Sequence, residues 1–491
     1  MEKNKQSILE GLNEAAEHVI SSLGPKGRKV ALVNDKDPHP KVSQDGVTIC
    51  RSMPRALSYK GHYYSFGAKM LTDAANTTVR NAGDGTTTTC LIARDLIQAT
   101  ENENVDIIND LKDTAKDIID QINSMSRKPT IEELRKMAIV TSRSRASMAT
   151  ELADMVWELG SKSHIQSYFG YENKIEIKKG YEFNNEFLLP IFWRWNQKSP
   201  TIEVFQDKIK LNDPFIVLIE EKISSGDTMV NILNQYANKG SIRPLVLMVS
   251  DIEGEALDIL ALNFSGGQNG RPMPVFPIKA PESGMKRVDM LDDIKAGVGG
   301  KVFSKYNGTK IKNFEGEFGE ASSITVFRNG TTHITFKDAF KERIEKRASQ
   351  VEDEERKSKL TKGVGIISMY APTEVETKEM AEVVEDVVRA CQTSLEHGVV
   401  PGSGYVFRNV KLPETRSGEI FGQVFESFFK ELTAQSSVPD GEGVFNIMTE
   451  QWESPEDTAI FDSCKSITES ITNSVSLAGE IISLKHAVYV S

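Results

Sequence analysis

The stretch Asn81-Ala-Gly-Asp-Gly-Thr-Thr-Thr-Thr-Cys90 decides how the rest of the chain is interpreted. Two glycines flank its single acid, and four threonines follow before an apolar periodicity typical of a helix begins. A glycine-rich turn that opens into a helix leaves free N–H groups pointing at one spot, at the positive end of the helix dipole. The stretch is therefore a candidate phosphate-binding loop. The alternative is an Asp-Gly hairpin turn that runs into a β-branched strand, and the local pattern alone does not separate the two.

The side chains of this loop suit a phosphate that is bound together with a metal ion. Asp84 would repel a bare phosphate, but its carboxylate could hold one through bound Mg²⁺. Hydroxyl groups after the second glycine would add donors around the same spot, on Thr86, Thr87 and Thr88. Stretches elsewhere in the chain must decide whether this phosphate site exists.

Length and composition are those of an ordinary soluble protein with several domains. The 491 residues predict about three domains of ~150 residues each. Hydrophobic residues make up 39% of the chain and charged residues 26%, which is enough apolar material for packed cores. The net charge of −11 argues against a nucleic-acid partner, because nucleic-acid-binding proteins normally carry a basic surface.

The sequence predicts a cytoplasmic protein with no membrane partner. It has no run of about 18 apolar residues that could span a bilayer. The start, Met1-Glu-Lys-Asn-Lys5, leads into a polar amphipathic segment and not into the apolar core of a signal peptide. The cysteines are scattered, without a CxxC pattern, at Cys50, Cys90, Cys391 and Cys464. They are expected to be buried thiols in a reducing cytosol, and neither a zinc site nor a disulfide framework is expected.

Apolar periodicity divides the chain into helical ends and a mixed middle. Helical spacing predicts helices over residues 7–23, 67–80, 91–125, 374–396, 417–433 and 463–482. From about residue 178, short apolar runs alternate with helical segments, which is typical of buried parallel strands joined by helices. These strands are expected at Pro214–Ile219 and Pro244–Ser250, and the helices at 226–240 and 253–263. A segment dense in Glu, Lys and Arg, Ala339–Lys362, predicts a solvated helix without chemistry.

Four loops of the chain occur in the order and approximate spacing found in one protein family. They are Leu23-Gly-Pro-Lys-Gly-Arg28, Gln44-Asp-Gly-Val47, Gly83-Asp-Gly-Thr-Thr-Thr88 and Gly398-Val-Val-Pro-Gly-Ser-Gly404. With these loops the chain resembles the group I chaperonins, as a divergent subunit of the GroEL type. Two further stretches are similar to the same family, Asp251-Ile-Glu-Gly-Glu-Ala-Leu257 and the run from Lys279-Ala-Pro281 to Met290-Leu-Asp-Asp-Ile294. The similarity covers nearly the whole chain.

The resemblance implies a multidomain α+β fold, the chaperonin fold, built from a discontinuous chain. A mostly helical equatorial ATPase domain would take residues 1–127 and 397–491. A small intermediate domain would take residues 128–178 and 364–396. An α/β apical domain, which binds substrate proteins in the family, would take residues 179–363.

The resemblance also assigns roles around a molecule of ATP. Asp84 would bind the Mg²⁺ that bridges the phosphates, while Gly85 and the three threonines after it cradle them. Residues that would pack against the nucleotide from the other side are Leu23, Gly24 and Pro25. Gly402 would allow close approach of the ribose, Asp462 would accept hydrogen bonds from its hydroxyls, and Asn446 would contact the base.

Two further acids are implied in hydrolysis. Asp386 would orient and activate the attacking water, on a segment that must close over the nucleotide. The alternative for an acid on such a helix is a surface carboxylate, and the match over Val384-Glu-Asp-Val387 favours the catalytic role. Asp45 would support hydrolysis as a second acid. The reaction is an in-line attack of water on the γ-phosphate, catalysed by positioning and charge neutralisation.

An apolar apical surface would bind unfolded client proteins. The residues that match the family's binding surface are Phe187, Ile191, Phe192, Val230, Leu233, Leu257, Ala261 and Leu262. The segment 253–263 has almost no polar face, and such a helix is either fully buried or presents apolar surface to a partner. Burial in the core is the commoner explanation, and it stays open for Leu233 and Leu257.

Several positions depart from the family's pattern. Gln44 stands where the family usually has a lysine, and Ser22 where it has a threonine. Both positions help to form a site for a monovalent cation, so a requirement for K⁺ stays open. Asn185 replaces an arginine that pairs between subunits with the acid matching Glu374, so that contact is expected to be lost.

The leading hypothesis is an ATP-driven folding chamber. The subunits are expected to form a closed homo-oligomeric ring of about seven, as cyclic symmetry favours, and the need for a co-chaperonin stays open. The chain is shorter than the family usually is between Gly404 and Asn446, which favours a single ring. A ring-forming holdase without productive ATP turnover is the alternative. A small-molecule kinase with a Gly-Thr phosphate loop would leave the apical similarity unexplained.

Overall fold

The computed structural model divides into two compact units. It describes residues 2–24, 26–34, 37–142, 145–163, 165–170, 172–178, 180–240, 242–266, 270–434 and 441–484. Unit 1 comprises residues 1–161, 167–175 and 368–491, and unit 2 comprises residues 162–166 and 176–367. The boundary between the units lies within each of three strands, β3 (Ile165–Phe169), β4 (Lys174–Lys178) and β15 (Val364–Met369).

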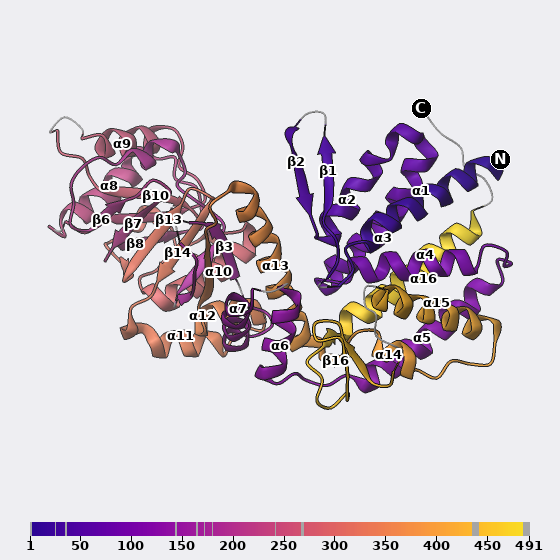
Figure 1. Ribbon diagram of the computed structural model, residues 1–491. Coiled ribbons are helices and arrows are strands. Elements are labelled where there is room, and N and C mark those ends of the chain that lie inside the picture. Colours follow the sequence, from indigo (N-terminus) through magenta and orange to yellow (C-terminus); the bar gives the residue numbers. More distant parts are fainter. Residues whose placement is uncertain are drawn as a thin grey trace. The chain divides into compact units, whose positions relative to one another are not determined.

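Unit 1 is mostly helical (Figure 1). Its helices are α1 (Glu2–Ile20), α2 (Gly46–Ala56), α3 (His62–Ala82), α4 (Thr86–Ala99), α5 (Ile107–Met125), α6 (Ile131–Thr141), α7 (Ala146–Leu159), α13 (Glu374–His397), α14 (Tyr405–Asn409), α15 (Arg416–Thr433) and α16 (Cys464–Ser483). Its strands form antiparallel pairs of β1 (Val30–Asn34) with β2 (Asp37–Ser43), β16 (Val399–Pro401) with β19 (Phe461–Ser463), and β17 (Val444–Asn446) with β18 (Gln451–Glu453).

The core of unit 1 forms around helix α4. Helices α1, α3 and α16 each pack against α4, and α3 also packs against α1 and against α16 (Figure 1). The backbones of α1 and α3 cross closely at Gly11 and Gly67, where a Cβ atom on either residue would overlap the backbone of the other helix. Apolar side chains on nearly every side of α4 are fully buried, among them Leu91, Ile92 and Leu96. Helix α4 therefore lies at the centre of this core.

Unit 2 alternates strands and helices. Its helices are α8 (Gly226–Ala237), α9 (Glu255–Phe264), α10 (Gly284–Val298), α11 (Lys341–Ala348) and α12 (Glu354–Thr361). One sheet has the order β10 (Val275–Lys279), β9 (Leu245–Val249), β8 (Phe215–Ile219), β11 (Val302–Phe303), parallel throughout, with β12 (Gly319–Glu320) antiparallel to β8. An antiparallel sheet has the order β5 (Tyr181–Phe183), β14 (Thr331–Thr335), β13 (Ser323–Phe327), β7 (Lys208–Asn212), β6 (Ile202–Val204).

Ion pairs to a buried aspartate link α10, α11 and α12. Asp293 on α10 is fully buried and accepts hydrogen bonds from the Nε atoms of Arg347 and Arg356, each at 2.7 Å. A second bond from Nη2 of Arg356 is 3.0 Å long. Two guanidinium groups therefore compensate one buried carboxylate, which would otherwise be costly to desolvate.

The predicted fold class is confirmed by a mostly helical unit 1 and an α/β unit 2. The predicted buried strands are β8 and β9, and they pair in parallel. The alternative of a β-branched strand after Gly85 is wrong, because α4 begins there. The expected helix over 91–125 is two helices, α4 and α5, and the expected helix over 339–362 is also two, α11 and α12.

Two further expectations concern the cysteines and the membrane. All four cysteines are free and buried, as expected. Among the helices that the structure describes, none is both long and apolar enough to cross a bilayer.

Candidate functional site

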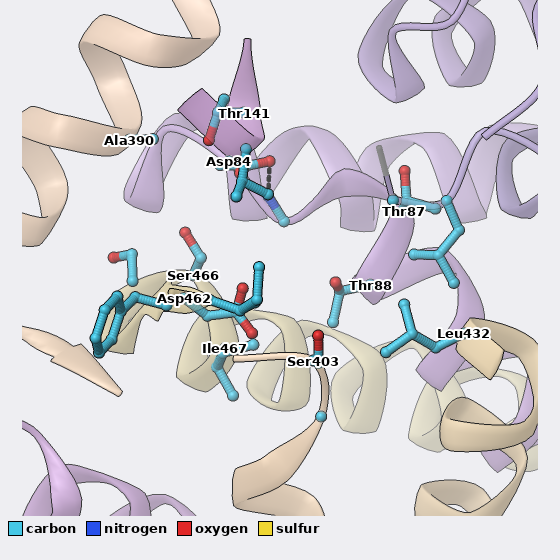
Figure 2. Close-up of a pocket in the computed structure, with 18 of the residues that line it drawn as sticks. Asp84, Thr87, Thr88, Thr141, Ala390, Ser403, Leu432, Asp462, Ser466 and Ile467 are labelled. Atoms are coloured by element: carbon cyan, nitrogen blue, oxygen red, sulfur yellow. Dashed lines mark hydrogen bonds between the residues drawn. The ribbon is translucent and has the colours of Figure 1, made fainter. Parts of the chain in front are cut away.

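The predicted phosphate loop is a sharp turn between two helices. Helix α3 ends at Gly83, which has a φ of 76°, and α4 starts after Gly85, which has a φ of 103°. Between them the Asp84 carboxylate accepts a hydrogen bond of 2.6 Å from the N–H of Gly85, the dashed line in Figure 2. Residues other than glycine rarely adopt these backbone φ values, so both glycines are needed for the turn. The first N–H groups of α4 have no partner inside the helix.

Helix α16 packs against this loop and forms hydrogen bonds with it. Ser470 donates a hydrogen bond of 3.3 Å to the carbonyl oxygen of Gly85. Thr89 donates to the same carbonyl at 2.9 Å, and its hydroxyl also lies 2.9 Å from that of Thr78. A Cβ atom on Gly85 would lie 2.9 Å from Ser470 Oγ. The backbone of the loop is therefore fixed by close packing as well as by hydrogen bonds.

A cavity of about 230 Å³ opens in front of the loop. Predicted site residues that line it are Leu23, Gly24, Asp84, Gly85, Thr87, Thr88, Asp386 and Asp462. They come from the α1–β1 connection, the phosphate loop, helix α13 and strand β19. Figure 2 shows Asp84, Thr88 and Asp462 around this space. The structure thus brings together acids that are far apart in the sequence.

Strand β19 places Asp462 in the cavity. Val400 of β16 pairs with Asp462, and the N–H of Gly402 donates to the carbonyl oxygen of Ile460 at 3.0 Å. A Cβ atom on Gly402 would lie 3.2 Å from Oδ2 of Asp462, so a glycine leaves room for this carboxylate. Burial, and next the negative charge of Asp84, raise the pKa of Asp462 to about 7, although the N–H of Ser403 lowers it. Two acids that disfavour each other's charge suit a site that receives a cation.

Helix α13 carries Asp386 to the same cavity. The helix packs directly on the phosphate loop, since a Cβ atom on Gly83 would lie 3.1 Å from Cβ of Arg389 and from Oγ1 of Thr393. Asp386, one turn before Arg389, lines the cavity and is half-buried. This position on α13 is compatible with the predicted role of orienting a water molecule.

Asp45 is the N-cap of helix α2. Its Oδ1 accepts a hydrogen bond of 3.1 Å from the N–H of Val47, and its Oδ2 one of 2.8 Å from the N–H of Thr48. It lines a second cavity of about 140 Å³, which Asp386 also lines. The two predicted catalytic acids therefore meet in this second cavity.

Other predicted residues lie near the first cavity without lining it. Thr86 is buried beneath the loop, and its Oγ1 has no hydrogen-bond partner in the described part of the chain. Asn446 is buried. Its side-chain amide donates a hydrogen bond to Glu453 at 2.6 Å and accepts one from the N–H of Met448 at 3.0 Å, so both of its ends are used within the β17–β18 hairpin. Its neighbour Ile447 lines the cavity. Pro25 lies outside the described residues.

Several lining residues were not predicted from the sequence. Among them are Thr141, Ser403, Phe428, Leu432, Ile447 and Ser466. Ser403 lies within a glycine-rich loop that the sequence did single out, and its φ of 53° is unusual for a residue other than glycine. The others belong to ordinary helical or loop patterns, which carry no sequence signal for a ligand.

The predicted client-binding residues of unit 2 differ in exposure. Val230 on α8 is 42% exposed and Leu262 on α9 is 56% exposed. The half-buried members are Ile191, Leu257 and Ala261. The buried members, which belong to the hydrophobic core of unit 2, are Phe187, Phe192 and Leu233. Leu189, which the sequence did not single out, is 38% exposed in the same segment as Ile191.

Comparison with known proteins identifies the family to which the chain belongs. A family model described as the TCP-1/cpn60 chaperonin family matches residues 15–412. The chain belongs to this family. The predicted recognition is thereby confirmed, and this chaperonin is a divergent one of the GroEL type.

Two solved structures share the fold of this chaperonin. Both are of the chaperonin gp146 from the bacteriophage EL 2 (Pseudomonas aeruginosa) in presence of ATP-BeFx. Crystal form I has a TM-score of 0.69 and 18% identity, and the match covers 99% of this chain and 98% of that chain. Crystal form II has a TM-score of 0.65 and 18% identity, with coverage of 98% and 97%. Family membership makes the protein a molecular chaperone.

Proposed function

We propose that this chain is the subunit of an ATP-driven folding chamber, which binds unfolded proteins and hydrolyses ATP. The single observation that carries the proposal is the meeting of Asp84, Asp386 and Asp462 around one cavity. These acids come from three separate parts of the sequence, and a surface carboxylate has no reason to converge with two others. Such a cluster suits a bound cation and a polyphosphate.

The residues present fit ATP bound with Mg²⁺. Thr86 Oγ1 is a buried hydroxyl oxygen without a hydrogen-bond partner in the described residues, next to the free N–H groups at the start of α4. Asp84 would hold Mg²⁺, which neutralises charge between the phosphate oxygens when it is bound. Gly85, Thr87 and Thr88 would surround the phosphates. Asp462, kept close to Gly402, would accept hydrogen bonds from the ribose.

The hydrolytic step would use the acid on α13. Asp386 would orient a water molecule in line with the γ-phosphate, and Asp45 would support it from the second cavity. The N–H groups of Val47 and Thr48 hold the Asp45 carboxylate in place for this role.

The client surface would be smaller than the matched set of residues. Val230 and Leu262 are the exposed members, and half-buried Leu257 would add to them. Phe187, Phe192 and Leu233 would support this surface from the core. The residue ranges proposed for equatorial, intermediate and apical domains remain those inferred from the resemblance.

The proposed assembly is a closed cytoplasmic ring of about seven subunits, as cyclic symmetry favours. Phosphate release from ATP, measured with and without an unfolded protein, tests the function. A folding chamber would hydrolyse ATP and return the client to its active form. A holdase, the alternative, would suppress client aggregation without ATP turnover. A chain that neither releases phosphate nor retains an unfolded client would contradict both.

A further inference from the structure

The second cavity contains a positive charge whose role the proposed site does not explain. Arg145, at the N-cap position of α7, lines this cavity together with Asp45 and Asp386. Its Nη1 atom is buried and donates no hydrogen bond within the described residues. A buried donor without a partner is costly, and in a native protein it calls for an explanation.

The other cations near this cavity are already paired. Lys29, which lines it, lies 3.0 Å from Oε1 of Glu379. Lys41 lies 2.7 Å from Oε1 of Glu382, another lining residue. Arg145 is therefore the lining cation with an unused buried donor among the described residues.

Gln44 lines the same cavity and brings no charge to it. Its amide donates to the carbonyl oxygen of Gly27, so its donor is used to hold the α1–β1 connection. A guanidinium group, planar and always charged, matches phosphate oxygens better than an ammonium does.

We infer that Arg145 is a catalytic residue of ATP hydrolysis, which donates hydrogen bonds to the γ-phosphate oxygens as charge spreads over them. The inference rests on the proposed function. In this step the oxygen of water bonds to the γ-phosphorus while the bond to the β–γ bridging oxygen breaks. ADP leaves with that electron pair, and the proton of the water passes to Asp386 and then to solvent. Arg145 keeps its charge and exchanges no proton throughout.

The test compares Arg145→Ala and Arg145→Lys with the parent chain. Single-turnover hydrolysis by Arg145→Ala should fall about 10³-fold, the scale of a phosphate-stabilising arginine, while the KM for ATP changes little. Binding of ADP with aluminium fluoride, which mimics the transition state, should weaken far more than binding of ADP with beryllium fluoride. Arg145→Lys should retain part of the rate. Gln44→Lys introduced into Arg145→Ala should recover part of it, because it returns a cation to the same cavity.

Lys29→Ala is the matched control, since it removes a paired cation from the same cavity. It should hydrolyse ATP at nearly the parental rate. If Arg145→Ala also does so while the parent is active, the inference is wrong and the proposed function stands. If Arg145→Ala loses ATP binding and thermal stability together with its rate, the role is structural and the inference is again wrong. A parent chain that releases no phosphate would overturn the proposed function itself, and this inference with it.

Discussion

Gly46 and Thr87 bring the starts of two helices into contact, because a Cβ atom on Gly46 would lie 2.5 Å from Oγ1 of Thr87. Gly46 is the first residue of α2 and directly follows Asp45. Thr87 is the second residue of α4 and lines the first cavity. A single close contact therefore joins helix α2, whose N-cap is the proposed acid Asp45, to helix α4, whose first residues would surround the phosphates.

The first prediction concerns Gly46→Ala. The new methyl group should turn the Thr87 hydroxyl away from its position in the cavity and weaken ATP binding, by about tenfold for the loss of one hydrogen bond. Titration of a fluorescent nucleotide measures this. Gly422→Ala is the matched control, because its new Cβ atom would meet Leu412 Cδ1 at an ordinary 3.5 Å. That variant should keep nucleotide affinity and gain about 0.5–1 kcal/mol of stability from the helix. Equal affinity in both variants would contradict the prediction.

Asp386→Ala is the second prediction. The variant should bind ATP normally, since the phosphate loop and Asp462 remain, but hydrolyse it about 10²–10⁴-fold more slowly. Binding and single-turnover hydrolysis, measured on one preparation, separate the two effects. Turnover at the parental rate would show that Asp386 does not orient the water.

The sequence predicted the turn at Asp84 because its flanking glycines are a local signal, whereas the choice between a helix and a β-branched strand after it needed other stretches of the chain. Two glycines around Asp84 dictate a turn with positive φ values, and the threonines that follow begin a helix. Long helices such as α13 were also predictable from their apolar spacing. Helix breaks were missed where the spacing resumes in the next helix. At Asp353, for example, a side-chain cap starts α12, yet the charged residues on both sides look continuous.

Tertiary packing decides what the local pattern cannot. Leu233 and Leu262 both fit a client surface in the sequence, but Leu233 is 5% exposed and Leu262 is 56% exposed. The same holds for Arg145, because its position in the sequence does not reveal that it shares a cavity with Asp45 and Asp386. Thr141 likewise reaches the first cavity only through the position of the last turn of α6.

The third prediction uses this difference between two leucines. Leu262→Ser should weaken capture of an unfolded client, because it removes exposed apolar surface, and should leave basal ATPase activity and stability unchanged. Leu233→Ser should instead lower the free energy of unfolding of unit 2 by at least about 2 kcal/mol, because it opens a buried site and places a hydroxyl there. Light scattering of an aggregating client and urea unfolding measure the two effects. Destabilisation by Leu262→Ser would place that side chain in the core.

The fourth prediction concerns the pH dependence of stability. A hydrogen bond from Arg127 lowers the pKa of Glu133 to about 2, assisted by the N–H of Thr130 in the capping box of α6. Because the folded pKa lies below the unfolded one, the stability that this pair contributes is present above about pH 4.5 and is lost as the pH falls toward 2. Glu133→Gln keeps the shape but not the charge. Parent and variant should differ in urea unfolding near neutral pH, and the difference should shrink below about pH 4.5 and vanish only near pH 2; an unchanged difference would contradict this assignment.

The last prediction is that this chaperonin works as a single ring, or as rings that separate easily. The chain is shorter than the family usually is between Gly404 and Asn446. What remains there is Leu432-Thr-Ala-Gln-Ser-Ser-Val-Pro-Asp-Gly-Glu-Gly443, of which residues 435–440 lie outside the described part of the chain. The missing material falls in the proposed equatorial domain, partly where the family builds its contacts between rings. A polar segment broken by a proline and glycines is poorly suited to a rigid contact surface. Contacts within a ring use other parts of that domain, so a closed ring of about seven subunits should persist. Native mass measurement with and without ATP decides: one ring, or two that dissociate with nucleotide, is expected. A stable double ring in every nucleotide state would show that the shortened segment is a harmless surface loop.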